Sequence, residues 1–191
     1  MTSISILGTG TMGQAIAAIA EKGGSTVQAL SSKDTDQAVT GDIVILAVPY
    51  TAISEVLAQR ADQLAGRTVV DISNPVDFQT FDSLTVPADS SAAAELAAAL
   101  PESKVLKAFN TTLGPTLVTG TVGDQPATVL IAGDDGDAKA QLADLITAGG
   151  LQSLDAGSLR RARELEALGF LQITLAATEK IAWSAGFAVI R

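Results

Sequence analysis

The sequence of 191 residues contains no cysteine and no histidine. Without cysteine, the chain can form neither disulfides nor thiolate metal sites, and it has no thiol nucleophile. Without histidine, it lacks the commonest general base and metal ligand, and serine–histidine and cysteine–histidine dyads are excluded. Any chemistry must therefore come from a bound cofactor or from carboxylates.

The sequence is also poor in positive charge. It carries 12 lysines and arginines against 21 acidic residues, a net charge of −9, which argues against nucleic acid or an anionic membrane as a partner. The first residues show no basic segment, apolar run and cleavage site, so we expect no signal peptide and a cytoplasmic protein. The most apolar stretch, 167–190, is interrupted by Gln172, Glu179 and Lys180, which predicts a buried helix rather than a membrane span.

Short apolar runs rich in β-branched residues alternate with segments of helical spacing along the chain. This alternation predicts an α/β fold, a Rossmann-like, doubly wound and mostly parallel sheet. We expect a single domain over residues 1–191, in which 158–191 form a C-terminal helical extension that packs on the domain or on a dimer partner. Strands are predicted at 3–8, 25–30, 42–49, 67–75, 103–110, 127–133 and 151–157, and helices at 11–22, 52–66, 91–100, 134–150 and 160–185.

Three connections between these elements carry further expectations. Only eight residues lie between Lys33 and Asp42, too few for a further helix and strand, so the sheet should be one strand short at that edge. Residues 76–89 are predicted to be irregular. The segment Thr111–Asp124, rich in glycine and threonine, is predicted to be a loop.

A G-x-G-x-x-G motif follows the first predicted strand and opens the first predicted helix, which is the context that dinucleotide binding requires. Gly8 would permit the tight turn, Gly10 would let a pyrophosphate approach the backbone, and Gly13 would let helix and strand pack closely. Amides at the start of the helix would face the phosphates. The predicted pyrophosphate site comprises Gly8, Thr9, Gly10, Thr11, Met12 and Gly13.

The end of the second strand indicates which dinucleotide is bound. Ser31, Ser32 and Lys33 offer two hydroxyls and an ammonium, which suit the 2′-phosphate of NADP better than a ribose hydroxyl. Asp34 leaves the alternative open, because its carboxylate could turn inward and accept the ribose 2′-hydroxyl of NAD. We predict NADP.

Six segments occur in the order and spacing of a known group: "ILGTGTMG", "DIVILAVPY", "VVDISNPVDF", "KVLKAFNT", "VLIAGDD" and "LDAGSLRRARELE". With these, nearly the whole chain resembles the F420-dependent NADP oxidoreductase family, and it is similar to the reductase domain of the STEAP metalloreductases. The resemblance implies that NADP lies along the carboxyl ends of the strands. It places Ala47, Val48, Pro49 and Tyr50 beside the ribose and pyrophosphate, and Ser73, Asn74, Pro75, Ala108, Phe109 and Asn110 at the nicotinamide.

The resemblance also implies the reaction, a direct hydride transfer between the nicotinamide and F420, with FMN or FAD as other possible second substrates. Such a transfer needs proximity and ring alignment rather than an acid–base side chain, so no catalytic residue and no metal are predicted. Related 3-hydroxyacid dehydrogenases and pyrroline-5-carboxylate reductases need a large helical second domain, for which this chain is too short. An NADP-binding sensor without turnover remains the alternative.

Several other groups have both a functional and a structural interpretation. Arg160, Arg161 and Arg163 could meet an anionic tail of the second substrate, but pairs with Glu164 and Glu166 on a helix surface are favoured. Phe170, Trp183 and Phe187 could line a ring pocket, yet a core position or a homodimer interface is favoured.

The remaining candidates lie at strand ends and helix starts. Tyr50 is as well explained by a cofactor contact as by packing. Asp71 is expected to hold the adjacent loop through backbone hydrogen bonds. Asp134, Asp135 and Asp137 resemble a metal site, but three acids in the first turn of a helix are better explained by capping.

Overall fold

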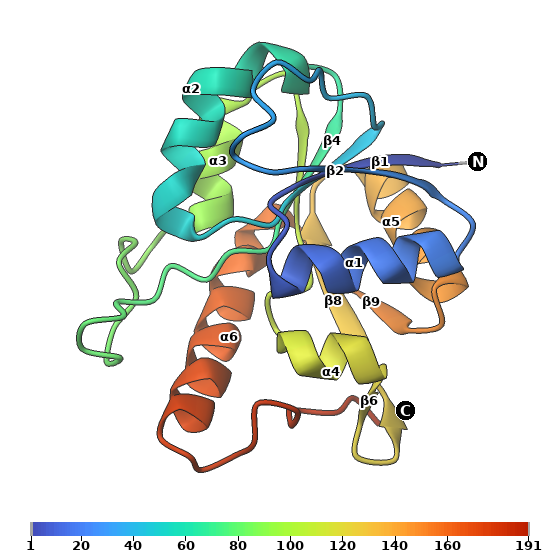
Figure 1. The fold of residues 1–191 in the computed structure, drawn as a ribbon. Helices are drawn as coiled ribbons and strands as arrows, with labels where there is room; N and C mark the ends of the chain where they lie inside the picture. The colour runs from blue at the N-terminus through green and yellow to red at the C-terminus, as the bar shows by residue number, and fades with distance from the viewer. Residues whose placement is uncertain (1, 191) are drawn as a thin grey trace.

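The computed structural model describes residues 2–190; the two end residues of the predicted domain, Met1 and Arg191, lie outside the described residues. A seven-stranded sheet of order β2-β1-β3-β4-β5-β8-β9 forms the centre of the molecule, with helices on both faces (Figure 1). The strands are β1 Ser3–Leu7, β2 Thr26–Leu30, β3 Ile43–Leu46, β4 Thr68–Asp71, β5 Lys104–Lys107, β8 Thr128–Gly133 and β9 Gln152–Gly157. The predicted Rossmann-like α/β fold is confirmed.

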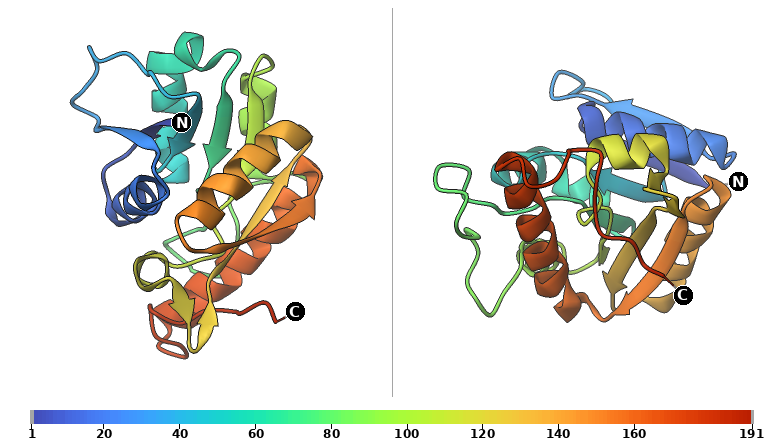
Figure 2. Two further views of the ribbon diagram at one scale, coloured as in Figure 1. Left: turned by 90° about the vertical axis from the view of Figure 1, so that its right-hand side faces the viewer. Right: turned by 90° about the horizontal axis from the view of Figure 1, so that it is seen from below.

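Six α-helices and two short 3-10 turns connect the strands among the described residues. Helices α1 and α5 lie toward one side of the sheet and α2 and α3 toward the other, while α6 runs away from the sheet edge (Figure 2). None of these helices is long and apolar enough to cross a bilayer. The helices are α1 Thr11–Lys22, α2 Ile53–Leu64, α3 Ala92–Ala99, α4 Gly114–Thr119, α5 Gly136–Ala148 and α6 Ala162–Ala177, and the 3-10 turns are η1 Tyr50–Ala52 and η2 Leu159–Arg161.

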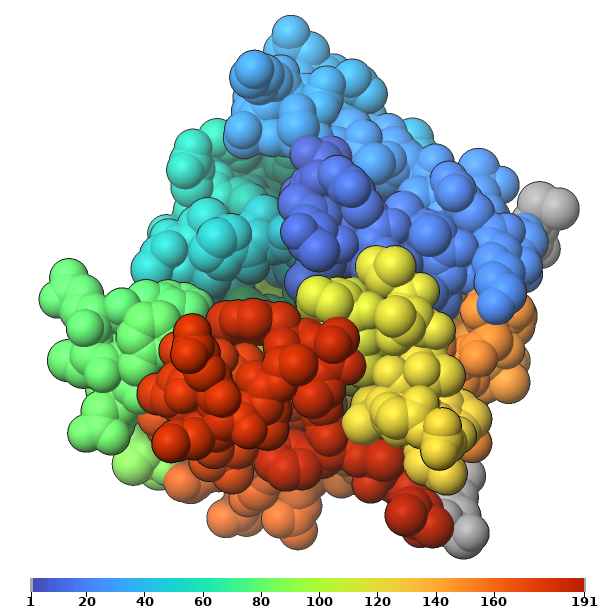
Figure 3. All heavy atoms as spheres, turned by 60° about the horizontal axis from the view of Figure 1, so that its bottom comes forward, coloured from blue at the N-terminus to red at the C-terminus, as the bar shows by residue number. Residues whose placement is uncertain are grey.

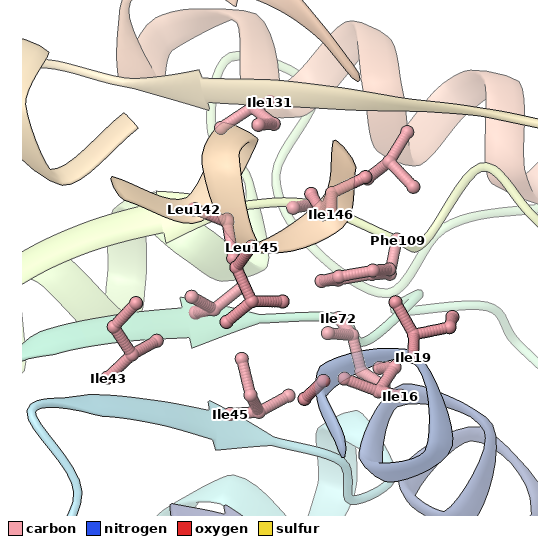
Figure 4. Packing of buried hydrophobic residues seen from close by; sticks show 14 of the residues in the cluster. Ile16, Ile19, Ile43, Ile45, Ile72, Phe109, Ile131, Leu142, Leu145 and Ile146 are labelled. Carbon is pink, nitrogen blue, oxygen red and sulfur yellow. The ribbon is translucent and has the colours of Figure 1, made fainter. Parts of the chain in front are cut away.

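Alternate residues of each central strand enter two separate hydrophobic cores. In β3, Ile43 and Ile45 pack under α1 and α5, whereas Val44 and Leu46 pack under α2 and α3. All four are fully buried, as the continuous apolar run of a strand covered on both faces requires. Figure 4 shows the first core, where isoleucines of α1 meet leucines of α5 across the strands. This double covering leaves the ends of the strands as the place for a site.

The sheet departs from a fully parallel arrangement at β8. Strands β2, β1, β3, β4 and β5 pair in parallel, but β8 runs antiparallel to β5, and β9 then runs parallel to β8. The carboxyl ends of the first five strands therefore share one edge of the sheet, while β8 and β9 end at the opposite edge. At the end of the sheet opposite β9, β2 is the edge strand. This confirms the prediction from the short connection that the sheet is one strand short there.

Two element predictions were wrong. The segment 111–124 is not a plain loop, because it contains the short helix α4 and the strand β6 Thr121–Val122, which pairs with β7 Gln125–Pro126. The last helix ends at Ala177 rather than at 185. There Glu179 adopts a left-handed conformation, with φ +57°, and the amides of Glu179 and Lys180 bond back to Ala176 and Leu175. This termination usually uses glycine, so a glutamate in its place gave no signal in the sequence.

Candidate functional site

The glycine loop joins β1 to α1 with the geometry that was predicted for it. A Cβ on Gly8, where φ is +115°, would lie 2.2 Å from the Ala47 carbonyl oxygen, and one on Gly13 would lie 2.1 Å from the Gly8 carbonyl oxygen. Around Gly10, in contrast, no heavy atom of the described residues, apart from its two chain neighbours, lies within 4 Å of an added Cβ. Gly8 and Gly13 thus serve close packing, and Gly10 leaves the backbone open to a ligand.

The start of α1 faces this open space without a side-chain cap. Gly10 is the N-cap residue, and within the described part of the chain it provides no side-chain cap to the first turn. Thr9 and Thr11 are exposed and Met12 is half-buried. Unpaired amides at a helix N-terminus attract an anion, because the helix dipole and the free N–H groups act together.

At the end of β2, the donors predicted for a 2′-phosphate are partly engaged. The Asp34 carboxylate accepts hydrogen bonds from the Ser31 amide (2.8 Å) and the Ser31 hydroxyl (2.6 Å). These bonds, the hydroxyl first, lower the pKa of Asp34 below its usual value. Ser32 and Lys33 are exposed. Asp34 therefore turns toward Ser31 and occupies two of the donors at this position.

Arg60 of α2 is a residue near this end that sequence reasoning missed. Its side chain is buried and donates to the backbone carbonyls of Asp34 and Gln37. Arg67 holds the same connection through the carbonyls of Val39 and Gly41. The two arginines thus fix the short link that replaces the missing helix and strand. A cavity of about 100 Å³ beside Arg60 is lined by Gly8, Leu30, Ser31, Ser32 and Val48, among others.

The segment after β3 runs next to the glycine loop. Ala47 and Val48 are half-buried and Pro49 is exposed, and the Ala47 amide donates to the Leu7 carbonyl (2.8 Å). The Tyr50 hydroxyl donates to Glu95 Oε2 (2.6 Å), and this bond raises the pKa of Tyr50 to about 12. The phenol is thus tied to α3 at the rim of a cavity of about 260 Å³ between α2 and α3.

The loops after β4 and β5 meet, as the resemblance implied. The side-chain amides of Asn74 and Asn110 are linked by a hydrogen bond of 2.9 Å, and the Asn74 amide group also donates to the Asn110 carbonyl. Asn110 donates in addition to the Leu165 carbonyl of α6. A Cβ on Gly169 would lie 2.4 Å from Asn74 Oδ1, so α6 can approach these two loops only because that position is a glycine.

Phe109 has an unusual backbone at this point. Its φ is +62°, and the Asn110 amide donates to the Ala108 carbonyl (2.8 Å) across it, which forms a γ-turn. Such a turn is strained for a bulky residue. The turn directs the Phe109 ring into the hydrophobic core, beside Ile72 and Ile146 (Figure 4). The ring is fully buried, so only the backbone of Phe109 can contact a ligand.

Two buried polar atoms in these loops have no partner within the described residues. They are Ser73 Oγ and Asn110 Oδ1, and both residues are 5% exposed. Both atoms can accept a hydrogen bond, and a buried acceptor without a donor is costly. Pro75 and Ala108, which flank them, are also buried. The pair offers acceptors to a ligand that brings N–H donors.

Beneath the same loops lies a cluster of three buried charges that the sequence reasoning did not identify. Lys107 Nζ lies 2.7 Å from Asp71 Oδ2, 2.9 Å from Glu166 Oε1 and 2.6 Å from the Ser73 carbonyl oxygen. All three side chains have no exposed surface. Asp71 also accepts from the Ser73 amide (2.8 Å), which confirms that it holds the adjacent loop.

Glu166 connects this cluster to α3. Its carboxylate accepts from the amides of Ala92 (3.0 Å) and Ala93 (3.3 Å) at the start of that helix. Burial raises the pKa of Glu166, against the opposing effect of the Lys107 ammonium. The expected surface pair of Glu166 with Arg163 was therefore wrong, and Glu164 pairs with Arg161 (3.7 Å) instead of Arg160. Asp71 and Lys107 face each other in adjacent strands, a signal that could have revealed the pair.

The other acidic group has a structural role. The Asp135 carboxylate caps α5 by accepting from the Ala138 amide (2.8 Å), so the capping interpretation is confirmed for Asp135, whereas Asp134 accepts from the Leu159 amide at the start of η2 instead. Within residues 2–190, no group of three histidine, cysteine or acidic side chains is arranged to hold a metal ion.

The segment after α6 folds back toward α4, where Thr116 Oγ1 donates to the Ala185 carbonyl (3.0 Å). Trp183 and Phe187 on this segment are each 51% exposed, and Phe170 is half-buried. Figure 3 shows a hollow between the glycine-loop segment in dark blue, the segment around α2 in cyan and the C-terminal segment in red. The predicted site residues follow the carboxyl ends of β1, β2, β3, β4 and β5, which share one edge of the sheet.

Comparison with known proteins shows which chains this one is similar to. A family model for coenzyme F420-dependent NADP oxidoreductases matches residues 18–75. The F420-dependent NADP reductase of Methanocaldococcus jannaschii is 31% identical over 163 residues, which cover 82% of this chain and 72% of that protein. The metalloreductase STEAP3 of Rattus norvegicus is 36% identical over 133 residues, 70% of this chain but only 26% of the rat protein, so the chain spans about a quarter of that relative.

A solved structure agrees with these sequence matches. The crystal structure of a candidate F420-dependent NADP reductase from Arthrobacter sp. FB24 superposes with a TM-score of 0.86 and 26% identity. The match covers 100% of both chains, so α4, the antiparallel β8 and the segment after α6 all lie within the region of similarity.

Proposed function

The chain belongs to the coenzyme F420-dependent NADP oxidoreductase family and is an NADP-dependent oxidoreductase; on this premise we propose that it passes a hydride directly between NADP(H) and a deazaflavin of the F420 type. Hydride transfer between two rings depends on their distance and alignment, not on an acid–base side chain. A chain without histidine and cysteine can perform it. The role of the protein is then to bind and orient the two rings and to exclude water.

The adenosine end of the proposed site lies at β1 and β2. The uncapped start of α1 and the open face of Gly10 fit a pyrophosphate, whose charge the helix N-terminus would stabilise. Ser31, Ser32 and Lys33 would bind the 2′-phosphate, with Ala47, Val48, Pro49 and Tyr50 beside the ribose and pyrophosphate. The 2′-phosphate must compete with the Asp34 carboxylate for the Ser31 amide and hydroxyl.

The nicotinamide end lies at β4 and β5, and the observation that carries the proposal is found there. Among residues 2–190, Ser73 Oγ and Asn110 Oδ1 are buried acceptors without a donor, and the carboxamide of nicotinamide carries an NH₂ group with two hydrogens to donate. Asn74 and Pro75 would border the ring, together with the backbone of Ala108 and Phe109. These acceptors lie at the same sheet edge as the uncapped α1 helix, as one extended dinucleotide would require.

We also propose that the chain forms a homodimer through the surface of α6 and the segment after it. Leu171 (48% exposed), Trp183 and Phe187 (each 51%) leave large apolar side chains in solvent on this part of the molecule, and a second copy of the chain would cover them. Sedimentation velocity at micromolar concentration is expected to give a dimer. A monomer alone would contradict this part of the proposal.

A cytoplasmic location also stays a prediction.

Two measurements test the function. Titration with NADPH and NADH should show tighter binding of NADPH, and oxidation of NADPH should then be followed with F420, FMN, FAD and riboflavin as acceptors. Turnover with F420 is expected. Turnover with a flavin alone would assign the second substrate to the flavins. Tight binding of NADPH without reduction of any acceptor would favour a sensor that binds NADP and has no turnover.

A further inference from the structure

We propose that Lys107 is a positioning residue for the nicotinamide half of the cofactor site. The inference rests on the proposed function, because it assumes that the nicotinamide binds at the loops after β4 and β5. It concerns a side chain that has no exposed surface and cannot touch the ring itself. Lys107 would act through Ser73.

Both backbone polar groups of Ser73 form hydrogen bonds with the buried charges. Its amide donates to Asp71 Oδ1 (2.8 Å), and its carbonyl accepts from Lys107 Nζ (2.6 Å). The same ammonium binds the other oxygen of Asp71 (2.7 Å), so the two contacts form one closed arrangement. Hydrogen bonds to charged groups are the stronger ones, especially where water is excluded. Lys107 and Asp71 therefore hold the backbone of Ser73, from which its Oγ projects.

The cluster also fixes the surroundings of the loop. Glu166 binds Lys107 (2.9 Å) from α6 and caps the start of α3, and Asn110, at the end of β5, donates to Leu165 (2.9 Å) on the same helix. The second orphan acceptor, Asn110 Oδ1, thus lies in a loop that is tied to the residue preceding Glu166. One buried ammonium connects β4, β5, α6 and, through Glu166, α3 around the two acceptors.

Buried ion pairs are often no more stable than apolar side chains of equal volume, so stability alone does not explain this cluster. Two carboxylates surround one ammonium, which leaves a formal charge of −1 in a place without solvent. A positioning role explains why these charges are buried despite the cost of removing them from water. The Lys107 ammonium donates a hydrogen bond to the Ser73 carbonyl, which an apolar side chain could not do.

The test compares NADPH with adenosine 2′,5′-bisphosphate, which carries the adenosine half of NADPH and lacks the nicotinamide. The variant is Lys107→Met combined with Asp71→Asn, which removes the ammonium and keeps the formal charge of the cluster at −1. The amide oxygen of the Asp71→Asn change can still accept from the Ser73 N–H. Lys139→Met is the matched control, because Lys139 also binds an aspartate, Asp155 (2.8 Å), and a backbone carbonyl, that of Gly157 (3.3 Å), away from this loop.

We expect the double variant to lose up to about tenfold in NADPH affinity, the loss expected when a displaced Ser73 Oγ no longer accepts a hydrogen bond from the carboxamide. Its affinity for adenosine 2′,5′-bisphosphate should stay within about twofold of the unchanged protein, as should both affinities of Lys139→Met. Partial unfolding would weaken both ligands by the same factor, so the ratio of the two affinities separates positioning from stability.

Three outcomes would overturn the inference. An unchanged ratio of NADPH to bisphosphate affinity would show that Lys107 does not act on the nicotinamide half. If the double variant does not fold, the same ratio is measured on Asp71→Asn alone. That change removes the ion pair between Asp71 and Lys107 while the ammonium stays. An unchanged ratio in this variant would also overturn the inference. Failure of the unchanged protein to bind the bisphosphate would instead refute the proposed function, and the inference with it.

Discussion

At the β1–β2 end of the sheet edge, most of the residues assigned to the cofactor are exposed or half-buried, whereas at the β4–β5 end most are buried. The first end consists of backbone: an open glycine, uncapped amides and a short turn. The second consists of buried side chains, three charges and two linked asparagines, which hold a strained loop. The comparison teaches that one end is an open surface of backbone, while the other is held in place by buried side chains.

The largest effect should come from breaking the buried end. Lys107→Met leaves the carboxylates of Asp71 and Glu166 together without solvent, and removing one partner of a buried ion pair costs about 3–5 kcal/mol. We expect urea denaturation to show a loss of this size. Lys139→Met breaks a pair whose aspartate is 60% exposed, so its loss should stay below about 1 kcal/mol. Equal losses would show that burial does not distinguish the two lysines.

The glycines of the backbone end should separate stability from binding. Gly13→Ala would place a Cβ 2.1 Å from the Gly8 carbonyl oxygen, and forcing extra volume into a packed site costs about 1–3 kcal/mol. Gly10→Ala meets no atom within 4 Å, so the free energy of unfolding should change little while NADPH binding weakens about tenfold or more. Thermal denaturation and NADPH titration of both variants check this. Normal NADPH binding by Gly10→Ala would refute pyrophosphate binding at this loop.

The choice between NADP and NAD is tested at Lys33. We expect Lys33→Ala to weaken NADPH binding by about tenfold, because a charge-assisted hydrogen bond to phosphate is lost. The affinity for NADH should stay nearly unchanged. Isothermal titration with both nucleotides measures this, and equal losses would argue against a 2′-phosphate at this position. Asp34→Asn is the matched change. It should strengthen NADPH binding, because in the unchanged protein the Asp34 carboxylate competes with the 2′-phosphate for the Ser31 amide and hydroxyl. A selective loss of NADH would mean that Asp34 binds the ribose.

The smallest effect concerns the pH dependence of stability. Burial raises the pKa of Glu166 above its ordinary 4.5, so the folded protein binds this proton more tightly than the unfolded chain. The stability contributed by protonated Glu166 is complete below about 4.5 and is lost as the pH rises through the raised pKa, with a slope of at most about 1.4 kcal/mol per pH unit.

Glu166→Gln removes this titration. The unfolding free energy of the unchanged protein minus that of the variant should fall as the pH rises above 4.5, as measured by denaturation at several pH values. Exposed aspartates with lowered pKa values, such as Asp135, have the opposite pH dependence, but they are common to both proteins and cancel. A difference that grows with pH would instead mean that the Lys107 ammonium outweighs burial and lowers the pKa of Glu166.

The backbone end could be predicted from the sequence because its signals are local. The three glycines, the strand before them and the helix after them lie within a short segment, and each constraint acts between near neighbours. The Schellman-type end of α6 at Glu179 could not be predicted, because the residue type contradicts the conformation. Likewise α4 is a helix of only six residues, and its Leu117 packs on the core only in the folded chain.

The buried end could be predicted only in part because its contacts join distant segments. The resemblance placed Ser73, Asn74 and Asn110 together, but Glu166 lies far along the chain from Lys107, and the sequence predicted for it a surface pair with Arg163. Its burial depends on the close approach of α6, which Gly169 permits. Arg60 was missed for the same reason, since its partners are backbone carbonyls more than twenty residues away.

The central claim, direct hydride transfer between NADP(H) and a deazaflavin, is tested most directly with NADPH that carries deuterium at the transferable position of the nicotinamide. After reaction with F420, the account predicts deuterium in the reduced deazaflavin and none released to water, because the hydride passes between two rings without an exchangeable intermediate. Deuterium found only in the solvent, or binding of NADPH with no reduction of F420, would contradict it.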